Sequence, residues 1–343
     1  MLFRLFLHAN RLVRYATDKL VGTSYTPTRD VVVITGGASG LGEQLAQRFA
    51  SHKATVISLD IHIPPPENRI DGVVYYECDV SNTDQVWEAQ NSIQSKYGSA
   101  SILINNAGIT AGKKLVDLTC HEVETILNVN LLASFYTVKA FLPAMLERNR
   151  GYIVTVGSVL GYMSPARLSV YGASKAGLVA LHESLTYELG SPMFHRGVKT
   201  LLVCPGQMKT PMFKSVATPS RLFAPELDVG YVADRIVAAV SLGQQGEIRL
   251  PLYGKFIPIF RAFPWPLVEL VRKVSGIDRS MQAFRSGASS LRGAATSLLA
   301  SSGSVLGPVS AVLEPGSASF GPVSEILDHS TAPPLDQPEG ALA

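Results

Sequence analysis

The sequence predicts an α/β fold built on one doubly wound parallel sheet with helices on both of its faces. Between residues 30 and 250, short apolar runs alternate with longer segments of helical periodicity, which is the pattern of parallel strands joined by crossover helices. Glycine-rich or polar residues follow several of the apolar runs. Because such sheets bind ligands at the carboxyl ends of their strands, we expect a site at that edge.

The composition is that of a globular protein with ample material for a core. The 343 residues are 46% hydrophobic and 17% charged, with a net charge of +3. So small a charge does not indicate a nucleic-acid partner. Cys78, Cys120 and Cys204 show neither metal-ligand spacing nor a disulfide framework. We interpret them as buried thiols in a reducing compartment, and we predict no metal site.

Residues 1–29 are predicted to form an amphipathic N-terminal segment followed by a linker. Apolar residues recur at three- and four-residue steps through residues 1–20, with Arg or Lys among the other positions. Its apolar runs are shorter than the roughly 20 residues that a membrane-spanning helix needs. Three interpretations stay open: a helix lying in a membrane surface, a mitochondrial presequence, and a helix packed on the protein's own core.

The first predicted strand and the turn after it indicate a nucleotide site. Asp30–Ile34 reads as a buried parallel strand, and the glycine-rich turn Thr35–Gly42 leads from it into a helical pattern that includes Phe49. Glycines in this context let the backbone approach a pyrophosphate at the helix N-terminus. The predicted domain, residues 30–250, is therefore Rossmann-like, although an ordinary glycine-rich turn has the same composition.

The second predicted strand, residues 54–59, ends at Asp60. This carboxylate comes eighteen residues after Gly42, where dinucleotide sites place a group that binds ribose hydroxyls. A 2′-phosphate there would face a like charge, so NAD(H) is favoured and NADP(H) stays the alternative. An Asp at a strand end is also a common turn former.

The later elements continue the alternation. Further strands are predicted at residues 73–78, 102–104, 152–156, 198–203 and 246–250, and helices at 82–97, 119–147, 171–189 and 229–242. The helix over 119–147 is expected to be interrupted near Asn128–Asn130 and to end near Pro143. The proline-rich residues 207–228 are predicted to form a mobile lid over the substrate.

A tyrosine and a lysine at the start of the helix 171–189 are suited to proton transfer. Tyr171 and Lys175 are four residues apart, which puts both side chains on one helix face. A nearby ammonium lowers the pKa of a tyrosine from its usual value of about 10, so the pair is a candidate general acid/base. Ser158, thirteen residues upstream, could hold a substrate oxygen beside it. Taken alone, such a pair is more commonly a solvated helix face.

The amino-acid composition of the chain changes after residue 250. Residues 251–285 are an apolar C-terminal extension, and residues 251–274 are rich in Phe, Pro, Leu, Ile and Trp. They could pack on the sheet, line a mouth that admits lipids, or sit in a membrane surface. Residues 286–343 are rich in Ser, Gly, Ala and Pro, which predicts a disordered low-complexity tail.

Together, these motifs resemble the short-chain dehydrogenase/reductase superfamily over about residues 30–250. The shared points, in the family's order, are Thr35–Gly42, Asn105–Gly108, Asn130, Ser158, Tyr171 with Lys175, and Pro205-Gly206 with Thr210. Asp60, Phe141-Leu142-Pro143 and Ile277–Met281 further resemble the branch that contains retinol dehydrogenases, lipid-droplet 17-beta-hydroxysteroid dehydrogenases and fungal membrane-associated members. The resemblance implies an oxidoreductase that transfers a hydride between a nicotinamide cofactor and a lipophilic alcohol or ketone, such as a retinoid, a steroid or a long-chain lipid.

The resemblance also implies roles for particular residues. Tyr171 would be the general acid/base, Lys175 would lower its pKa and hold the nicotinamide ribose, and Ser158 would orient the substrate oxygen. Asn130 would position a water in a proton relay. The implied cofactor-binding residues are Gly36, Ser39, Gly40, Leu41, Gly42, Asp60, Asp79, Val80, Asn106, Ala107, Gly108, Lys139, Tyr171, Lys175 and Thr210. For Lys139, a solvated helix lysine is an equal alternative.

Two other functions remain in competition. One is an NADPH-dependent lipid ketone reductase, and the other is a lipid-surface binding or scaffold protein with a vestigial site. A scaffold has no physical need for all four catalytic residues. The expected partners are an apolar small molecule and a membrane or lipid-droplet surface, with a homodimer left open. The expected location is the cytosolic face of the endoplasmic reticulum or of lipid droplets, with mitochondria as the alternative.

Overall fold

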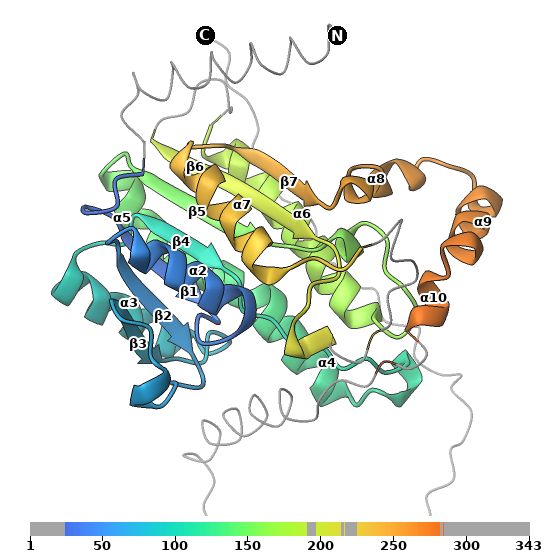
Figure 1. The fold of residues 1–343 in the computed structure, drawn as a ribbon, viewed down its shortest axis with the longest axis horizontal. Coiled ribbons are helices and arrows are strands. Elements are labelled where there is room, and N and C mark those ends of the chain that lie inside the picture. Colours follow the sequence, from blue (N-terminus) through green and yellow to red (C-terminus); the bar gives the residue numbers. More distant parts are fainter. Residues whose placement is uncertain (1–24, 191–196, 214–215, 217–224, 282–283, 285–343) are drawn as a thin grey trace, which may run out of the picture. The chain divides into compact units, whose positions relative to one another are not determined.

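The computed structural model confirms a single sheet of seven parallel strands with helices on both faces (Figure 1). The structure describes residues 25–190, 197–213, 216, 225–281 and 284. The strands are β1 (Val31–Thr35), β2 (Thr55–Asp60), β3 (Val73–Glu77), β4 (Ile102–Asn105), β5 (Gly151–Val156), β6 (Val198–Pro205) and β7 (Gly246–Leu250). Their order is β3-β2-β1-β4-β5-β6-β7, so the direction of winding reverses between β1 and β4, where such sheets bind their ligands.

Two layers of helices bury the two faces of the sheet. On one face lie α2 (Gly40–Ser51) and α7 (Val229–Ser241), and on the other α3 (Thr83–Tyr97), α5 (Ala133–Glu147) and α6 (Ser169–Glu188). Val32 packs with the first layer and Val33 with the second, because successive side chains of a strand point to opposite faces. Central strands such as β1 are therefore buried on both faces.

The long helix before β5 is interrupted as expected but does not end where the sequence suggested. α4 (Cys120–Leu127) passes through a π-helical turn, Asn128–Leu132, into α5. The expected end near Pro143 is wrong, because Pro143 lies inside α5, which continues to Glu147. Phe141 and Met145 are buried on either side of the proline, and their packing outweighs the one backbone hydrogen bond that a proline removes.

The extension after β7 folds into short helices beside the carboxyl edge of the sheet (Figure 1). They are the 3₁₀ turn η6 (Leu252–Lys255), α8 (Ile257–Phe260), α9 (Trp265–Ser275) and α10 (Ile277–Ser280). The predicted amphipathic helix over residues 1–20 and the tail over 286–343 lie outside the described residues. So does part of the predicted lid, whose described part contains the 3₁₀ turn η5 (Pro211–Phe213) and a bridge between Met208 and Leu227. Lid mobility stays a prediction.

Cys120 departs from the expectation that all three cysteines are buried. Cys78 and Cys204 are buried, but Cys120 is exposed at the first residue of α4. The capping box of Thr119 and Glu122 sets the start of this helix, and the first turn of a capped surface helix faces water.

Candidate active site

The predicted motifs converge on one cavity of about 1330 Å³ at the carboxyl ends of the strands. The predicted residues that line it are Gly36, Ser39, Gly40, Leu41, Asp60, Asp79, Val80, Asn106, Ala107, Gly108, Ser158, Tyr171, Lys175 and Thr210. Gly42, Asn130 and Lys139 are not among the lining residues. The C-terminal extension also contributes to the lining, through side chains such as Tyr253, Phe256 and Val271, which agrees with one of the three alternatives that the sequence left open for residues 251–274.

The glycine turn between β1 and α2 has the geometry of an anion site. Gly36 and Gly40 adopt positive φ angles of 63° and 55°, a region that favours glycine. A Cβ on Gly42 would lie 1.9 Å from the carbonyl oxygen of Gly36, so α2 begins directly on the turn. The Ser39 side chain makes no capping hydrogen bond, which leaves first-turn amides for a bound anion. The residues present fit the pyrophosphate of a dinucleotide.

The neighbouring strand ends hold this turn in place. The Ala38 amide donates to Asp60 Oδ2 at 3.0 Å, so the carboxylate at the end of β2 both braces the turn and lines the cavity. From the end of β4, Asn106 Nδ2 donates to the carbonyl oxygens of Thr35 and Gly36, each at 3.0 Å. These contacts tie the glycine turn to its neighbours on both sides.

Tyr171, Lys175 and Ser158 meet as the sequence predicts, and all three are buried. Lys175 Nζ donates to the Val156 carbonyl oxygen at 2.9 Å and lies 5.8 Å from the centre of the Tyr171 ring. Ser158 Oγ accepts from the Leu160 amide at 3.1 Å. The end of β5 and the first turns of α6 thus present a hydroxyl, a phenol and an amine to one cavity.

The pKa of Tyr171 shifts opposite to the sequence-based expectation. Burial raises its pKa to about 12, and a side-chain hydrogen bond with Ser158 works in the lowering direction. Burial lowers the pKa of Lys175 to about 8. The pKa of Tyr171 is therefore raised overall, against the lowering expected beside Lys175, because desolvation disfavours the charged form of each group.

Part of that burial comes from residues far along the chain. The Phe213 ring meets the Tyr171 ring edge-on at 5.9 Å, and Phe284 stacks on Phe213 at 5.7 Å. Met281 belongs to the same buried cluster. The lid region and the C-terminal extension therefore supply the apolar surroundings of the phenol.

Asn130 lies beneath the cavity and has a positioning role in this structure. Its Oδ1 accepts from the Ile109 amide at 2.7 Å, and its Nδ2 donates to the Ile109 carbonyl at 2.9 Å. The π-helical turn directs this side chain onto the loop after β4. A Cβ on Gly108 would lie 3.4 Å from Asn130 Oδ1 and 3.8 Å from Lys175 Nζ, so the contact also sets the space around the lysine. The water-positioning role of Asn130 stays a prediction.

Lys139 is not brought to the site. It is exposed on α5 and does not line the cavity, which corrects its assignment to the cofactor and agrees with the alternative of a solvated helix lysine. Along α5, the buried positions Thr137, Val138 and Ala140 face the protein interior, and helix periodicity turns residue 139 toward solvent.

Comparisons with known proteins agree with this geometry. The family model described as short chain dehydrogenase matches residues 30–221. The uncharacterized oxidoreductase YDL114W of Saccharomyces cerevisiae is 35% identical over 264 residues, covering 74% of this chain and 86% of the relative. Retinol dehydrogenase 10-B of Danio rerio is 34% identical over 284 residues, covering 74% and 84%. A short-chain dehydrogenase/reductase of Burkholderia phymatum, solved in complex with NAD, superposes with a TM-score of 0.59 at 25% identity, covering 70% of this chain and 94% of that one.

The fold, the site and these matches define the class of the protein. The chain belongs to the short-chain dehydrogenase family, in its retinol-dehydrogenase-like branch. It is an oxidoreductase that uses a nicotinamide cofactor and acts on CH–OH groups.

Replacing Lys175 with Met should change how stability depends on pH. The lysine's pKa is about 8 in the folded protein against an ordinary 10.5, so between these values the unfolded chain binds more protons and the free energy of unfolding rises with pH. Tyr171 acts oppositely only above its ordinary value of 10.0. Burial also raises the pKa of Cys78 and of Cys204 from 9.0, so above that pH both thiols make the free energy of unfolding fall with pH in either protein. Urea unfolding from pH 8 up to pH 10 should therefore give the wild type a more positive slope than Lys175→Met.

The matched control is Lys139→Met, which removes an exposed lysine and should keep the wild-type slope. Equal slopes for the wild type and Lys175→Met would contradict the burial of a lysine with a lowered pKa.

Proposed function

We propose that this dehydrogenase transfers a hydride between NAD(H) and a lipophilic alcohol or the matching carbonyl compound. The observation that carries the proposal is that the catalytic side chains and the apolar C-terminal extension line the same cavity. Phe256, Phe260 and Leu270 line the cavity that Tyr171 and Ser158 also line, and such a surface suits a retinoid, a steroid or a long-chain alcohol. The similarity to retinol dehydrogenase 10-B supports the same class.

The protein's own residues supply the proton chemistry. Ser158 and Tyr171 hold the substrate oxygen between two hydroxyl groups, and Tyr171 exchanges the proton with that oxygen as the C–H bond breaks or forms. Lys175 keeps its amine against the Val156 carbonyl, where it can hold a ribose hydroxyl and bear positive charge as the phenol ionises. The cofactor, when bound, supplies hydride acceptance or donation.

The residues around Asp60 support NAD(H) over NADP(H). Asp60 lines the cavity at the end of β2, where a 2′-phosphate would meet its carboxylate. Among the cavity-lining residues that the structure describes, only His62 and Lys175 can carry a positive charge, and Lys175 belongs to the catalytic group. The NADPH-dependent alternative would need a cation beside that ribose.

A membrane-surface location is the second part of the proposal. Large apolar side chains of η6, α8, α9 and the residues that connect them are exposed: Leu252, Phe256, Ile259, Phe263, Trp265 and Leu267. Lys255, Arg261 and Lys273 are exposed among them. An exposed apolar patch bordered by cations, with a tryptophan 73% exposed, suits a bilayer interface rich in anionic head groups. We propose the cytosolic face of the endoplasmic reticulum or of lipid droplets; a homodimer stays a prediction.

The one described helical stretch that is long and apolar enough to span a bilayer does not provide this contact. It is Cys120–Glu147, and half of its most apolar window is buried within the fold. Its role in covering the sheet explains that composition.

Tyr171→Phe should abolish most of the activity without unfolding the protein. The phenylalanine keeps the ring and removes the proton, and loss of a general acid/base costs about 10²–10⁴-fold in rate. Turnover of NAD⁺ with a lipophilic alcohol measures it. Tyr162→Phe is the control, since Tyr162 bonds Glu247 at 2.7 Å and does not line the cavity. Wild-type turnover in Tyr171→Phe would rule out this mechanism.

Asp60→Ala should shift the cofactor preference toward NADP(H). Removing the like charge should change the ratio of kcat/KM for NAD⁺ and NADP⁺ by about tenfold, or about 1.4 kcal/mol. Asp60→Asn removes the charge but keeps an acceptor for the Ala38 amide. It therefore separates the effect of the charge from the effect of losing the hydrogen bond that braces the turn. Glu77→Ala changes the exposed residue paired with Asp60 on β3 and is the control. A wild type equally efficient with NADPH would refute the NAD(H) preference.

Full-length protein should pellet with membranes or float with lipid droplets. Removing residues 1–20 should release it only partly, because the patch on η6, α8 and α9 remains. Adding Trp265→Ser and Leu267→Ser, which do not line the cavity, should complete the release. Full-length protein wholly in the soluble fraction would end the proposal, and import into mitochondria with loss of the first residues would favour the presequence.

A further inference from the structure

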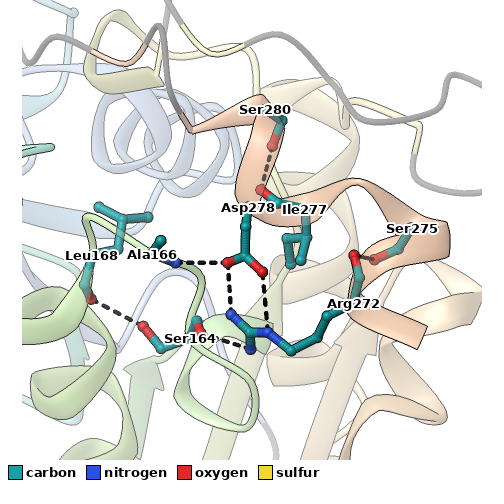
Figure 2. Close-up of polar contacts among 8 residues, drawn as sticks. All are labelled: Ser164, Ala166, Leu168, Arg272, Ser275, Ile277, Asp278 and Ser280. Atoms are coloured by element: carbon teal, nitrogen blue, oxygen red, sulfur yellow. Dashed lines mark hydrogen bonds and ion pairs between the residues drawn. The ribbon is translucent and has the colours of Figure 1, made fainter. Parts of the chain in front are cut away.

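Arg272 and Asp278 form an ion pair within the C-terminal extension, and both residues also form hydrogen bonds with the loop that precedes the catalytic helix (Figure 2). Arg272 of α9 contacts Asp278 of α10 through two hydrogen bonds, Nη2 to Oδ1 at 2.6 Å and Nε to Oδ2 at 3.1 Å. Its Nη1 also donates to the Ser164 carbonyl at 3.1 Å. The Ala166 amide donates to Asp278 Oδ1 at 2.8 Å. We call these four residues the clasp.

The clasp matters because α9 has little else to hold it. No side chain of α9 is buried, so apolar packing contributes little to its position. The helix ends at Gly276, whose φ of +67° reverses the chain into α10. α10 is anchored by Met281 in the apolar cluster around Tyr171. The bidentate pair between Arg272 and Asp278 fixes the angle between the two helices, since a guanidinium and a carboxylate bind in one plane.

On its inner side, α9 covers part of the cavity. Leu270, Val271 and Val274 line the cavity, whereas Arg272 and Asp278 do not. The charged pair therefore lies outside the space that the substrate occupies and acts on it only through the helix. Tyr171 lines the same cavity from α6, so a substrate that contacts both Tyr171 and α9 lies with its apolar body in the space between the two helices.

The other end of the clasp lies against the catalytic helix. Ser164 Oγ donates to the Leu168 carbonyl at 3.0 Å. A Cβ on Gly172, the residue after Tyr171, would lie 2.1 Å from Ser164 Oγ. The loop that accepts the hydrogen bond of Arg272 is thus in contact with the first turn of α6. The clasp therefore fixes the position of α9 relative to Tyr171.

We propose that Arg272 and Asp278 are positioning residues that hold α9 as the roof of the cavity and so set the length of apolar substrate that the site binds. The proposal rests on the proposed lipophilic substrate. An apolar chain long enough to reach α9 gains affinity from the roof only while the roof is held in place. A chain too short to reach it gains nothing from the clasp.

The test measures binding of straight-chain primary alcohols, from hexanol to dodecanol, to full-length protein with NADH, by displacement of a fluorescent apolar probe. Each additional methylene that becomes buried raises affinity about fourfold. The wild type should show this rise up to dodecanol. Arg272→Gln and Asp278→Asn should bind hexanol within about twofold of the wild type and lose at least two of the increments for the longer alcohols, about tenfold or more in total.

Lys273→Gln is the matched control. Lys273 is the neighbour of Arg272, and its ion pair with Glu269 at 2.8 Å stays within α9 and is exposed. This variant should keep the wild-type dependence on chain length. If it flattened the dependence equally, charge on α9 rather than the clasp would be responsible, and the proposal would be overturned.

The remaining outcomes separate the two proposals. Wild-type chain-length dependence in folded Arg272→Gln and Asp278→Asn would overturn the clasp and leave the lipophilic substrate intact. If Arg272→Gln failed to fold, Asp278→Asn alone would decide, because its amide keeps an acceptor for Ala166. A wild type whose affinity did not rise with chain length would refute the lipophilic substrate, and the clasp with it.

Discussion

The burial of Lys175 is the constraint around which the site is organised. An amine removed from water needs a partner, and the Val156 carbonyl at the end of β5 provides one at 2.9 Å. The loop after β4 approaches the same amine through Gly108, which has no side chain to exclude it. Asn130 holds that loop from below. One buried cation thus depends on β5, the loop after β4, the π-helical turn and α6 together.

The apolar side chains that line the cavity near Tyr171 also affect its acid/base chemistry. Phe213, Met281 and Phe284 surround Tyr171, and burial raises its pKa. The raised pKa favours the protonated phenol, the form that donates to a carbonyl oxygen, over the phenolate. The same apolar groups that surround the acid/base residue therefore also raise its pKa.

The C-terminal extension has two surfaces with different roles. Its inner side lines the cavity, and its outer side exposes aromatic and aliphatic groups among cations. Val274 lines the cavity and is 80% exposed, so the boundary between the two surfaces lies at the mouth of the site. A lipophilic substrate arriving from a lipid surface would meet this part of the chain first.

By itself, the sequence determined the parallel sheet, its layers of helices and the catalytic and glycine-motif residues that line the cavity. Those predictions depend on local patterns: apolar runs such as Val31–Ile34, glycines that a turn requires, and the four-residue spacing of Tyr171 and Lys175. Only the tertiary structure showed that the extension packs near Tyr171, that Lys139 is exposed to solvent and that α5 continues beyond Pro143. Each of these depends on contacts between residues far apart in the chain. The direction of the pKa shift of Tyr171 also depends on tertiary structure, because burial raises this pKa and the spacing of residues in a sequence does not show how deeply they are buried.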